Sequence, residues 1–226
     1  MKLQVVGTDA LMLYLGDSAN LHTLSQIGAA CAAIEAALGD DLLDMVPSYA
    51  SVLIIFDALH HSHQAIALRV RAALAQLDEL SATQGRLVTL PVYYAPEAGE
   101  DLEALAQAAK LSVEAVIELH TGVEYRVYAI GFAPGFAYLG EVDARIAQPR
   151  RATPRPRVPR GAVAIADRQT AVYPDVSPGG WNLIGRCPVR LFDPHAQPCM
   201  PLAVGDRVRF EAVARERFLA LGGELT

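Results

Sequence analysis

Lysine is almost absent from this sequence, and cysteine is scarce. The 226 residues include 19 basic and 25 acidic side chains, for a formal net charge of −6, and only Lys2 and Lys110 are lysines. A chain with this charge has no long-range attraction to nucleic acid or to an anionic membrane. The three cysteines are odd in number and form no CxxC pair, which argues against a disulfide framework and a zinc site. We therefore expect a reduced, cytoplasmic protein without a metal site.

Long hydrophobic runs and several common catalytic motifs are also missing. The longest apolar stretches, at residues 29–38 and 52–56, are far shorter than the roughly 20 residues that a membrane span needs. The first residues lack the basic region of a signal peptide. The sequence contains no GxxxxGK[ST] phosphate loop, no GxSxG nucleophile elbow and no HExxH motif. Any ATP site is therefore expected to be unusual or shared with another chain.

The first 94 residues alternate between strand and helix patterns. Apolar periodicity predicts strands at residues 3–7, 11–15, 42–48, 51–57 and 86–94, and helices at residues 24–38 and 63–80. This order, ββαββαβ, indicates an antiparallel or mixed sheet covered by two helices. We predict a small N-terminal α/β sandwich domain.

The remainder of the chain is rich in strands and in proline. Two short helices are predicted at residues 101–111 and 113–119, with Ser112 capping the second. Short β runs follow at residues 125–132, 161–167, 170–174, 182–185, 188–193 and 206–213, and a short helix is expected at residues 216–221. Twelve of the 14 prolines lie after residue 95. This pattern favours a β-barrel or closed sandwich, so we predict an α+β protein with domains at residues 1–88 and 89–226.

Two segments combine glycine with aromatic residues. Residues 131–140, GFAPGFAYLG, either let the backbone approach a ligand or form a tight turn with Phe132 and Phe136 as core residues. In residues 177–181, SPGGW, Gly179 and Gly180 can adopt positive φ and form an anion site, although a hairpin turn followed by Trp181 is the commoner structure.

Arginine and histidine supply the candidate polar groups. Residues 145–168 hold seven arginines, and a few of them are expected to converge on a carboxylate or phosphate. His120 ends a predicted helix, where it either caps the helix or transfers protons. His60, His61 and His63 have no carboxylate or cysteine at ligand spacing, so we interpret them as surface residues.

Four long motifs in the same order resemble the family of the B-type subunit of 5-oxoprolinase, which includes the KipI-type sensor-kinase inhibitors and allophanate hydrolase subunit 1. They are GFAPGFAYLG, PRRATPRPRVPRGAVAIADRQTAVYP, SPGGWNLIGRCPVRLFD and VGDRVRF, and VPSYASVLIIFD extends the likeness into the first domain. The chain departs from the family at Ala164, Asp167 and Ala171, where glycines are expected, and at Cys187, where threonine is usual.

The resemblance implies a cyclophilin-like β-barrel for the C-terminal domain. It also implies the B-type member of an oxoprolinase complex that, together with its C-type and A-type subunits, converts 5-oxoproline to glutamate using ATP, for which we expect Mg²⁺ as well. Two alternatives stay open. One is a binding protein that inhibits a sensor histidine kinase, and the other is half of a urea-type or allophanate-type carboxyltransferase.

Residue roles follow from this chemistry. We expect Arg155 and Arg157 to bind carboxylate or phosphate, and the backbone of Gly179 and Gly180 to contact an anion. His120 is the candidate proton-transfer group. Apolar walls are expected from Phe132, Phe136 and Trp181.

Overall fold

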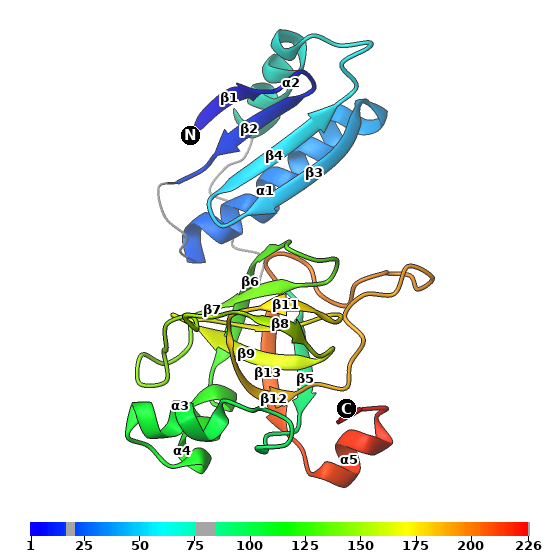
Figure 1. The fold of residues 1–226 in the computed structure, drawn as a ribbon. Helices are drawn as coiled ribbons and strands as arrows, with labels where there is room; N and C mark the ends of the chain where they lie inside the picture. The colour runs from blue at the N-terminus through cyan, green and yellow to red at the C-terminus, as the bar shows by residue number, and fades with distance from the viewer. Residues whose placement is uncertain (17–20, 76–84, 226) are drawn as a thin grey trace. The chain divides into compact units, whose positions relative to one another are not determined.

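The computed structural model describes residues 1–16, 21–75 and 85–225 (Figure 1). The chain divides into two compact units, Met1–Gly85 and Arg86–Thr226, which we call unit 1 and unit 2. Helices and antiparallel strands occur in both, which confirms the mixed α and β composition that the sequence predicts. In the described ranges, no helix has the length and apolar character needed to cross a membrane.

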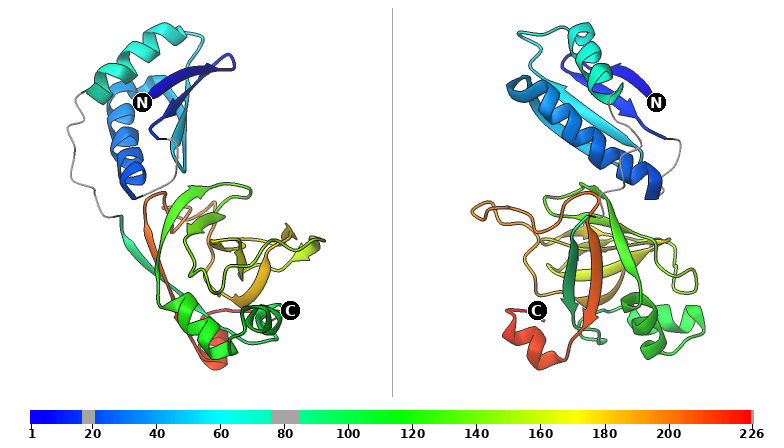
Figure 2. Two further views of the ribbon diagram at one scale, coloured as in Figure 1. Left: turned by 90° about the vertical axis from the view of Figure 1, so that its left-hand side faces the viewer. Right: turned by 180° about the vertical axis from the view of Figure 1, so that it is seen from behind.

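Unit 1 is a four-stranded antiparallel sheet with two helices on one face (Figure 2). The elements are β1 (Lys2–Val6), β2 (Ala10–Tyr14), α1 (Leu21–Leu38), a 3₁₀ turn (Gly39–Asp41), β3 (Leu42–Ser48), β4 (Ser51–Phe56) and α2 (His63–Ala75), with strand order β1-β2-β4-β3. Alternate residues of β4 are buried, as expected for a sheet with one covered face. Residues 76–80 of the second predicted helix lie outside the described residues.

Unit 2 contains the remaining strands. They are β5 (Leu87–Val92), β6 (Glu124–Ile130), β7 (Ala137–Gly140), β8 (Arg155–Val158), β9 (Ala162–Ala166), β10 (Gln169–Val172), β11 (Ser177–Gly179), β12 (Asn182–Arg186) and β13 (Arg207–Ala212). The order is β5-β13-β6-β7-β10-β9-β12, antiparallel except for the parallel pair β5–β13, and β8 pairs with β11 separately. A bridge between Tyr93 and Arg186 joins the ends of β5 and β12, the two outer strands of this order. The cyclophilin-like topology stays a prediction.

Three helices complete unit 2: α3 (Leu102–Ala109), α4 (Val113–Thr121) and α5 (Arg215–Ala220). Ser112 caps α4 as predicted, because its hydroxyl accepts a hydrogen bond from the Ala115 backbone N–H at 3.1 Å. Apolar residues of α3, α4 and the strands, including Leu105, Val116 and Val127, share one buried core.

Several expectations about the strands differ from the structure. Residues 188–193 form no strand. No strand is predicted at residues 137–140, 155–158 or 177–179, which form β7, β8 and β11. The strand predicted at residues 86–94 pairs with β13 in unit 2. The hydrophobic pattern of a strand reports which of its faces is buried but does not identify its hydrogen-bonded neighbour, so the pattern could not assign this strand to a sheet.

Candidate functional site: an aromatic pocket in unit 2

Five of the eight predicted site residues line one pocket of about 170 Å³. They are Phe132, Phe136, Gly179, Gly180 and Trp181. Tyr138, Tyr173, Arg150 and Arg151 also contribute to what we call the aromatic pocket. The two glycine-rich segments, about 40 residues apart in the sequence, therefore line the same pocket.

Phe136 is the centre of the aromatic cluster. Its ring makes edge-to-face contacts with Phe132, Tyr138, Tyr173 and Trp181, at centroid separations of 5.3, 5.0, 5.2 and 5.7 Å. These are favoured arrangements of aromatic quadrupoles. Phe136 is buried and Phe132 is 61% exposed, so Phe136 acts as a core residue while Phe132 offers its ring at the mouth of the pocket.

The backbone at Phe132 is held in an uncommon conformation. Its φ of 73° lies in the left-handed region, where a non-glycine residue costs of the order of 1–3 kcal/mol. The surrounding loop supports it, since the Phe136 N–H donates to Ala133 O and the Gly131 N–H donates to Phe136 O, each at 3.0 Å. Strain of this kind at an exposed aromatic side chain is typical of ligand-binding loops.

Gly179 and Gly180 do not adopt the left-handed backbone that glycine makes possible. Neither is among the positive-φ residues of the described chain, and Gly179 is the last residue of β11. A Cβ at Gly179 would collide with the Tyr173 hydroxyl, so the glycine allows the tyrosine to approach the backbone. Gly180 O accepts a hydrogen bond from the Arg151 backbone N–H at 2.8 Å. This pair of glycines therefore shapes the pocket wall, and contact of its backbone with an anion stays a prediction.

Asp101 anchors two of the arginines, and sequence reasoning missed it. This carboxylate is 6% exposed; its Oδ1 accepts from Arg151 Nη1 at 2.6 Å and from Arg155 Nη2 at 2.8 Å. Its Oδ2 accepts from the Leu183 backbone N–H at 2.8 Å. Asp101 is at the N-cap position of α3 but makes no capping hydrogen bond with its side chain. The only sequence signal was an acid at a helix start, which normally indicates a cap.

The two arginines predicted to bind substrate do not line the aromatic pocket. Arg155 pairs with Asp101, a hydrogen bond that raises the pKa of the guanidinium, and Arg157 lines a different pocket. Arg150 instead lies beside the aromatic cluster, with its Cζ 5.8 Å from the centre of the Trp181 ring. Within the described residues Arg150 makes no ion pair, so its guanidinium is available to a ligand carboxylate.

Tyr173 supplies a neutral hydroxyl to the pocket wall. Burial is the main cause that raises its pKa, and the Trp181 backbone N–H, which hydrogen-bonds to the hydroxyl, partly offsets that effect. The phenol therefore stays protonated near neutral pH.

His120 is not brought to the aromatic pocket. Its ring is fully buried and stacks on Phe210 at a centroid separation of 4.6 Å. Nε2 lies 2.9 Å from the Thr170 hydroxyl, which donates its own proton to Ala164 O, so Nε2 is the donor. Nδ1 then accepts from the Tyr94 hydroxyl at 2.7 Å. Burial lowers the pKa of His120 to about 3, so the ring is neutral.

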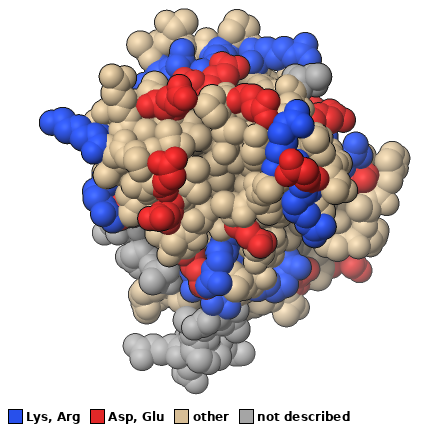
Figure 3. Space-filling model, turned by 90° about the horizontal axis from the view of Figure 1, so that it is seen from below, with Lys and Arg blue, Asp and Glu red and all other residues tan. Residues whose placement is uncertain are grey.

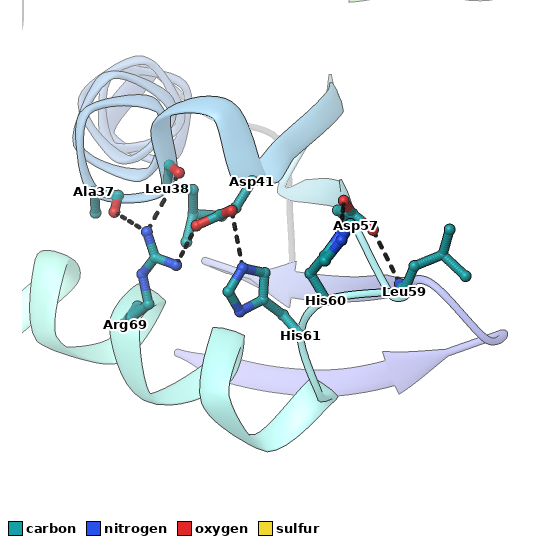
Figure 4. A network of polar contacts seen from close by, with 8 residues as sticks. All are labelled: Ala37, Leu38, Asp41, Asp57, Leu59, His60, His61 and Arg69. Carbon is teal, nitrogen blue, oxygen red and sulfur yellow. Dashed lines mark hydrogen bonds and ion pairs between the residues drawn. The ribbon is translucent and has the colours of Figure 1, made fainter.

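Two of the three histidines at residues 60–63 have carboxylate partners that the sequence pattern does not reveal (Figure 4). His60 Nδ1 lies 2.6 Å from Asp57, and His61 Nε2 lies 2.8 Å from Asp41. Arg69 also binds Asp41 and donates to the last carbonyls of α1, at Ala37 and Leu38. His60 and His61 therefore have one acid each. His63 is half-buried with its ring edge-on to Phe56, and its Nε2 has no hydrogen-bond partner among the described residues. No trio of His, Cys, Asp or Glu suited to a metal occurs in the ranges described.

The sequence profile of the carboxyltransferase domain, subdomain C and D, matches residues 1–202. A protein of Bacillus subtilis (strain 168), named as the B-type subunit of 5-oxoprolinase, is 36% identical over 229 residues, covering 97% of this chain and 95% of its own. A protein of the same name from Haemophilus influenzae is 42% identical over 159 residues, covering 70% and 74% of the two chains.

Solved structures agree on the fold. The structure titled TTHA0988 has a TM-score of 0.80 and 40% identity over 91% of this chain, which spans only 40% of that longer chain. The protein PH0987 of Pyrococcus horikoshii has a TM-score of 0.58 and 39% identity, with 96% of this chain and 100% of its own covered. Urea amidolyase of K. lactis shares the fold at a TM-score of 0.73 and 18% identity, with coverages of 96% and 15%.

Proposed function

Because the chain belongs to the family of the 5-oxoprolinase B-type subunit, we propose that it works in an ATP-dependent complex that opens 5-oxoproline to glutamate. Its partners in this proposal are the A-type and C-type subunits of that complex. The observation that carries the proposal is the aromatic pocket, which combines apolar walls with a guanidinium that has no acidic partner among the described residues. The names of the relatives favour this function over kinase inhibition or urea carboxylation.

The shape and chemistry of the pocket fit a small cyclic carboxylate. A five-membered lactam presents a flat apolar ring, for which Phe132 and Trp181 provide walls, and a carboxylate, for which Arg150 provides a cation. Asp101 pairs with Arg151 and Arg155, and Glu100 pairs with Arg155 as well, so among the described residues Arg150 is the arginine of this pocket without an acidic partner. The Tyr173 hydroxyl is available as a hydrogen-bond donor.

ATP explains how such an unreactive amide is opened. Transfer of the γ-phosphoryl group to the lactam oxygen yields ADP and an activated ring carbon. Water adds to that carbon, and the ring C–N bond breaks as the leaving nitrogen takes up a proton, which leaves an acyl phosphate. A second water hydrolyses the acyl phosphate to release glutamate and phosphate. The chain has no phosphate loop, so we place the ATP and Mg²⁺ site with the partner subunits or shared with them. In this proposal the role of the aromatic pocket is to hold and orient the lactam.

The test is 5-oxoproline-dependent phosphate release by the reconstituted complex. Arg150→Gln should raise the KM for 5-oxoproline about tenfold or more, because a charge-assisted contact to the substrate carboxylate is lost. Arg145→Gln is the matched control, since Arg145 is exposed, pairs with Asp143 and does not line the pocket. A KM for Arg150→Gln equal to that of the control would contradict this use of the pocket.

Further expectations from the sequence belong to the same proposal. We propose a cyclophilin-like barrel within residues 89–226 and a cytoplasmic location. We also propose that His120 acts through the core that supports the strands, and that Arg155 positions the pocket through Asp101.

A further inference from the structure

A second pocket in unit 2 has a different character from the aromatic pocket. It has a volume of about 160 Å³ and is lined by three arginines, Arg157, Arg160 and Arg186. We call it the arginine pocket. The end of β12 and the C-terminal residues of the chain, including Glu224, also contribute to it (the C label in Figure 1 marks this terminus).

Arg186 is buried and incompletely bonded. It is 7% exposed, and its Nη1 donates to the main-chain oxygens of Arg160 at 3.4 Å and Glu224 at 3.2 Å. Its Nε is buried without a hydrogen-bond partner among the described residues. An unsatisfied buried donor costs about 1–3 kcal/mol, more when it is charged. Arg186 lines the arginine pocket, so this incompletely bonded guanidinium contributes its charge to the pocket wall.

The local backbone is built around this arginine. Gly161 has a φ of 78°, and a Cβ at that position would collide with the Cys187 carbonyl and lie 3.2 Å from Arg186 Cδ. The Cys187 N–H donates to Gly161 O at 2.7 Å, which fixes the loop against the end of β12. The Arg186 side chain is thus held in place before any ligand arrives.

The charge balance of the arginine pocket favours an anion. Arg157 has no ion pair within the part of the chain that is described, and Arg160 has only a long contact of 3.9 Å to the Glu224 carboxylate, which is 72% exposed. The other lining acid, Asp175, accepts a hydrogen bond from the Val176 N–H. Burial raises the pKa of the Cys187 thiol to about 12, so it adds no negative charge. Three guanidinium groups therefore face two carboxylates.

We propose that the arginine pocket binds a phosphate-sized oxyanion, either free inorganic phosphate or a terminal phosphate of a nucleotide. The planar forks of three arginines suit a tetrahedral anion, which offers more acceptor oxygens than a carboxylate. The residues involved do not overlap those of the aromatic pocket, so this site does not depend on the lactam proposal.

The test is calorimetric titration of inorganic phosphate into the full-length chain at constant ionic strength. Saturable binding should weaken about tenfold or more in Arg157→Gln, because one charge-assisted contact is lost. Arg168→Gln removes an exposed arginine that pairs with Glu141 outside both pockets, and it should bind as the wild type does. Equal phosphate affinity in the two variants, or no saturable binding by the wild type, would overturn the proposal.

A second variant tests the role of Arg186, and a competition experiment identifies the source of the phosphate group. Arg186→Lys keeps the positive charge but removes Nε and the planar fork, so phosphate binding should again weaken about tenfold. If this variant does not fold, the Arg157 comparison still decides. If a non-hydrolysable ATP analogue displaces phosphate from the wild type but does not bind Arg157→Gln, the site belongs to a nucleotide. If the analogue leaves phosphate binding unchanged, the site belongs to the free ion. In either case 5-oxoproline should not displace phosphate, which separates this site from the aromatic pocket.

Discussion

At the scale of single residues, His120 shows burial overriding a local electrostatic preference. The last turn of a helix favours a protonated histidine, but the helix dipole contributes only about 0.3–1 kcal/mol at an ordinary site. Full burial lowers the pKa of His120 to about 3, a much larger effect. The sequence shows where His120 sits on α4 but not that β10 and β13 enclose it, so its neutral state could not be predicted.

A pH-dependent stability follows from this pKa. The unfolded state protonates His120 near its ordinary value of 6.5 and the folded state only near 3, so between these values the unfolded state binds more protons. Stability should therefore fall as pH drops below about 6.5, by up to about 1.4 kcal/mol per pH unit from this group. Urea unfolding at pH 7, 6 and 5 gives the free energy of unfolding at each pH. Its dependence on pH should be weaker in His120→Gln than in the wild type, because glutamine does not titrate.

The control for that measurement is His195→Gln, because His195 is an exposed loop residue and its loss should leave the slope unchanged. If the free energy of unfolding of His120→Gln depends on pH as strongly as that of the wild type, the histidine is not held neutral in the core. The same variant tests the catalytic expectation, since turnover per folded molecule should persist if His120 only supports the strands.

At the scale of elements, Asp101 connects segments that local sequence patterns treat as independent. It joins the start of α3 to Arg151, to Arg155 in β8 and to the Leu183 backbone in β12. Asp101→Asn should lower the free energy of unfolding by about 2 kcal/mol or more, because two guanidinium groups lose their buried counter-charge. Urea unfolding at pH 7 measures this.

Asp143→Asn is the comparison for Asp101→Asn, since Asp143 pairs with one exposed arginine, Arg145, and its loss should leave stability near that of the wild type. In the reconstituted complex Asp101→Asn should also raise the KM for 5-oxoproline more than it lowers kcat, as expected of a residue that positions the pocket. Equal stability of the two variants would contradict the anchoring role of Asp101.

The helices and strands also show how much of the structure can be predicted from the sequence. Hydrophobic periodicity predicted α3, α4 and most strands, because each pattern reports which side of its own element is buried. It missed three short strands in segments rich in glycine or proline, β7, β8 and β11, and it predicted a strand at residues 188–193 that does not form. The motifs supplied five residues of the aromatic pocket, but Asp101 and Arg150 were missed because their roles depend on contacts through space.

At the scale of the whole molecule, charge is distributed without a dominant sign. Figure 3 shows basic and acidic side chains interspersed over the face seen from below, in line with the modest net charge of −6. Recognition of small anions therefore depends on local arrangements of arginine, as in the two pockets of unit 2, and not on a general positive field.

Unit 2 should fold without unit 1. Its buried core is formed by residues between Leu90 and Phe210, whereas the core of unit 1 runs from Leu11 to Leu74, and neither buried cluster takes residues from both. Both pockets are also lined entirely by unit 2. A fragment of residues 86–226 should therefore be soluble, unfold cooperatively in urea and keep both ligand sites.

Trp181 makes this measurement direct, because it is the only tryptophan of the chain and it is buried in the wall of the aromatic pocket. Its fluorescence should report the same urea midpoint in the fragment as in the full chain, since the signal follows unit 2 alone. Red-shifted emission from the fragment without denaturant would show that unit 1 is needed for the aromatic pocket to form. Equal urea midpoints for the fragment and the full chain would show that unit 1 is not needed to form the pockets. Unit 1 would then have another role, such as contact with another protein of the complex.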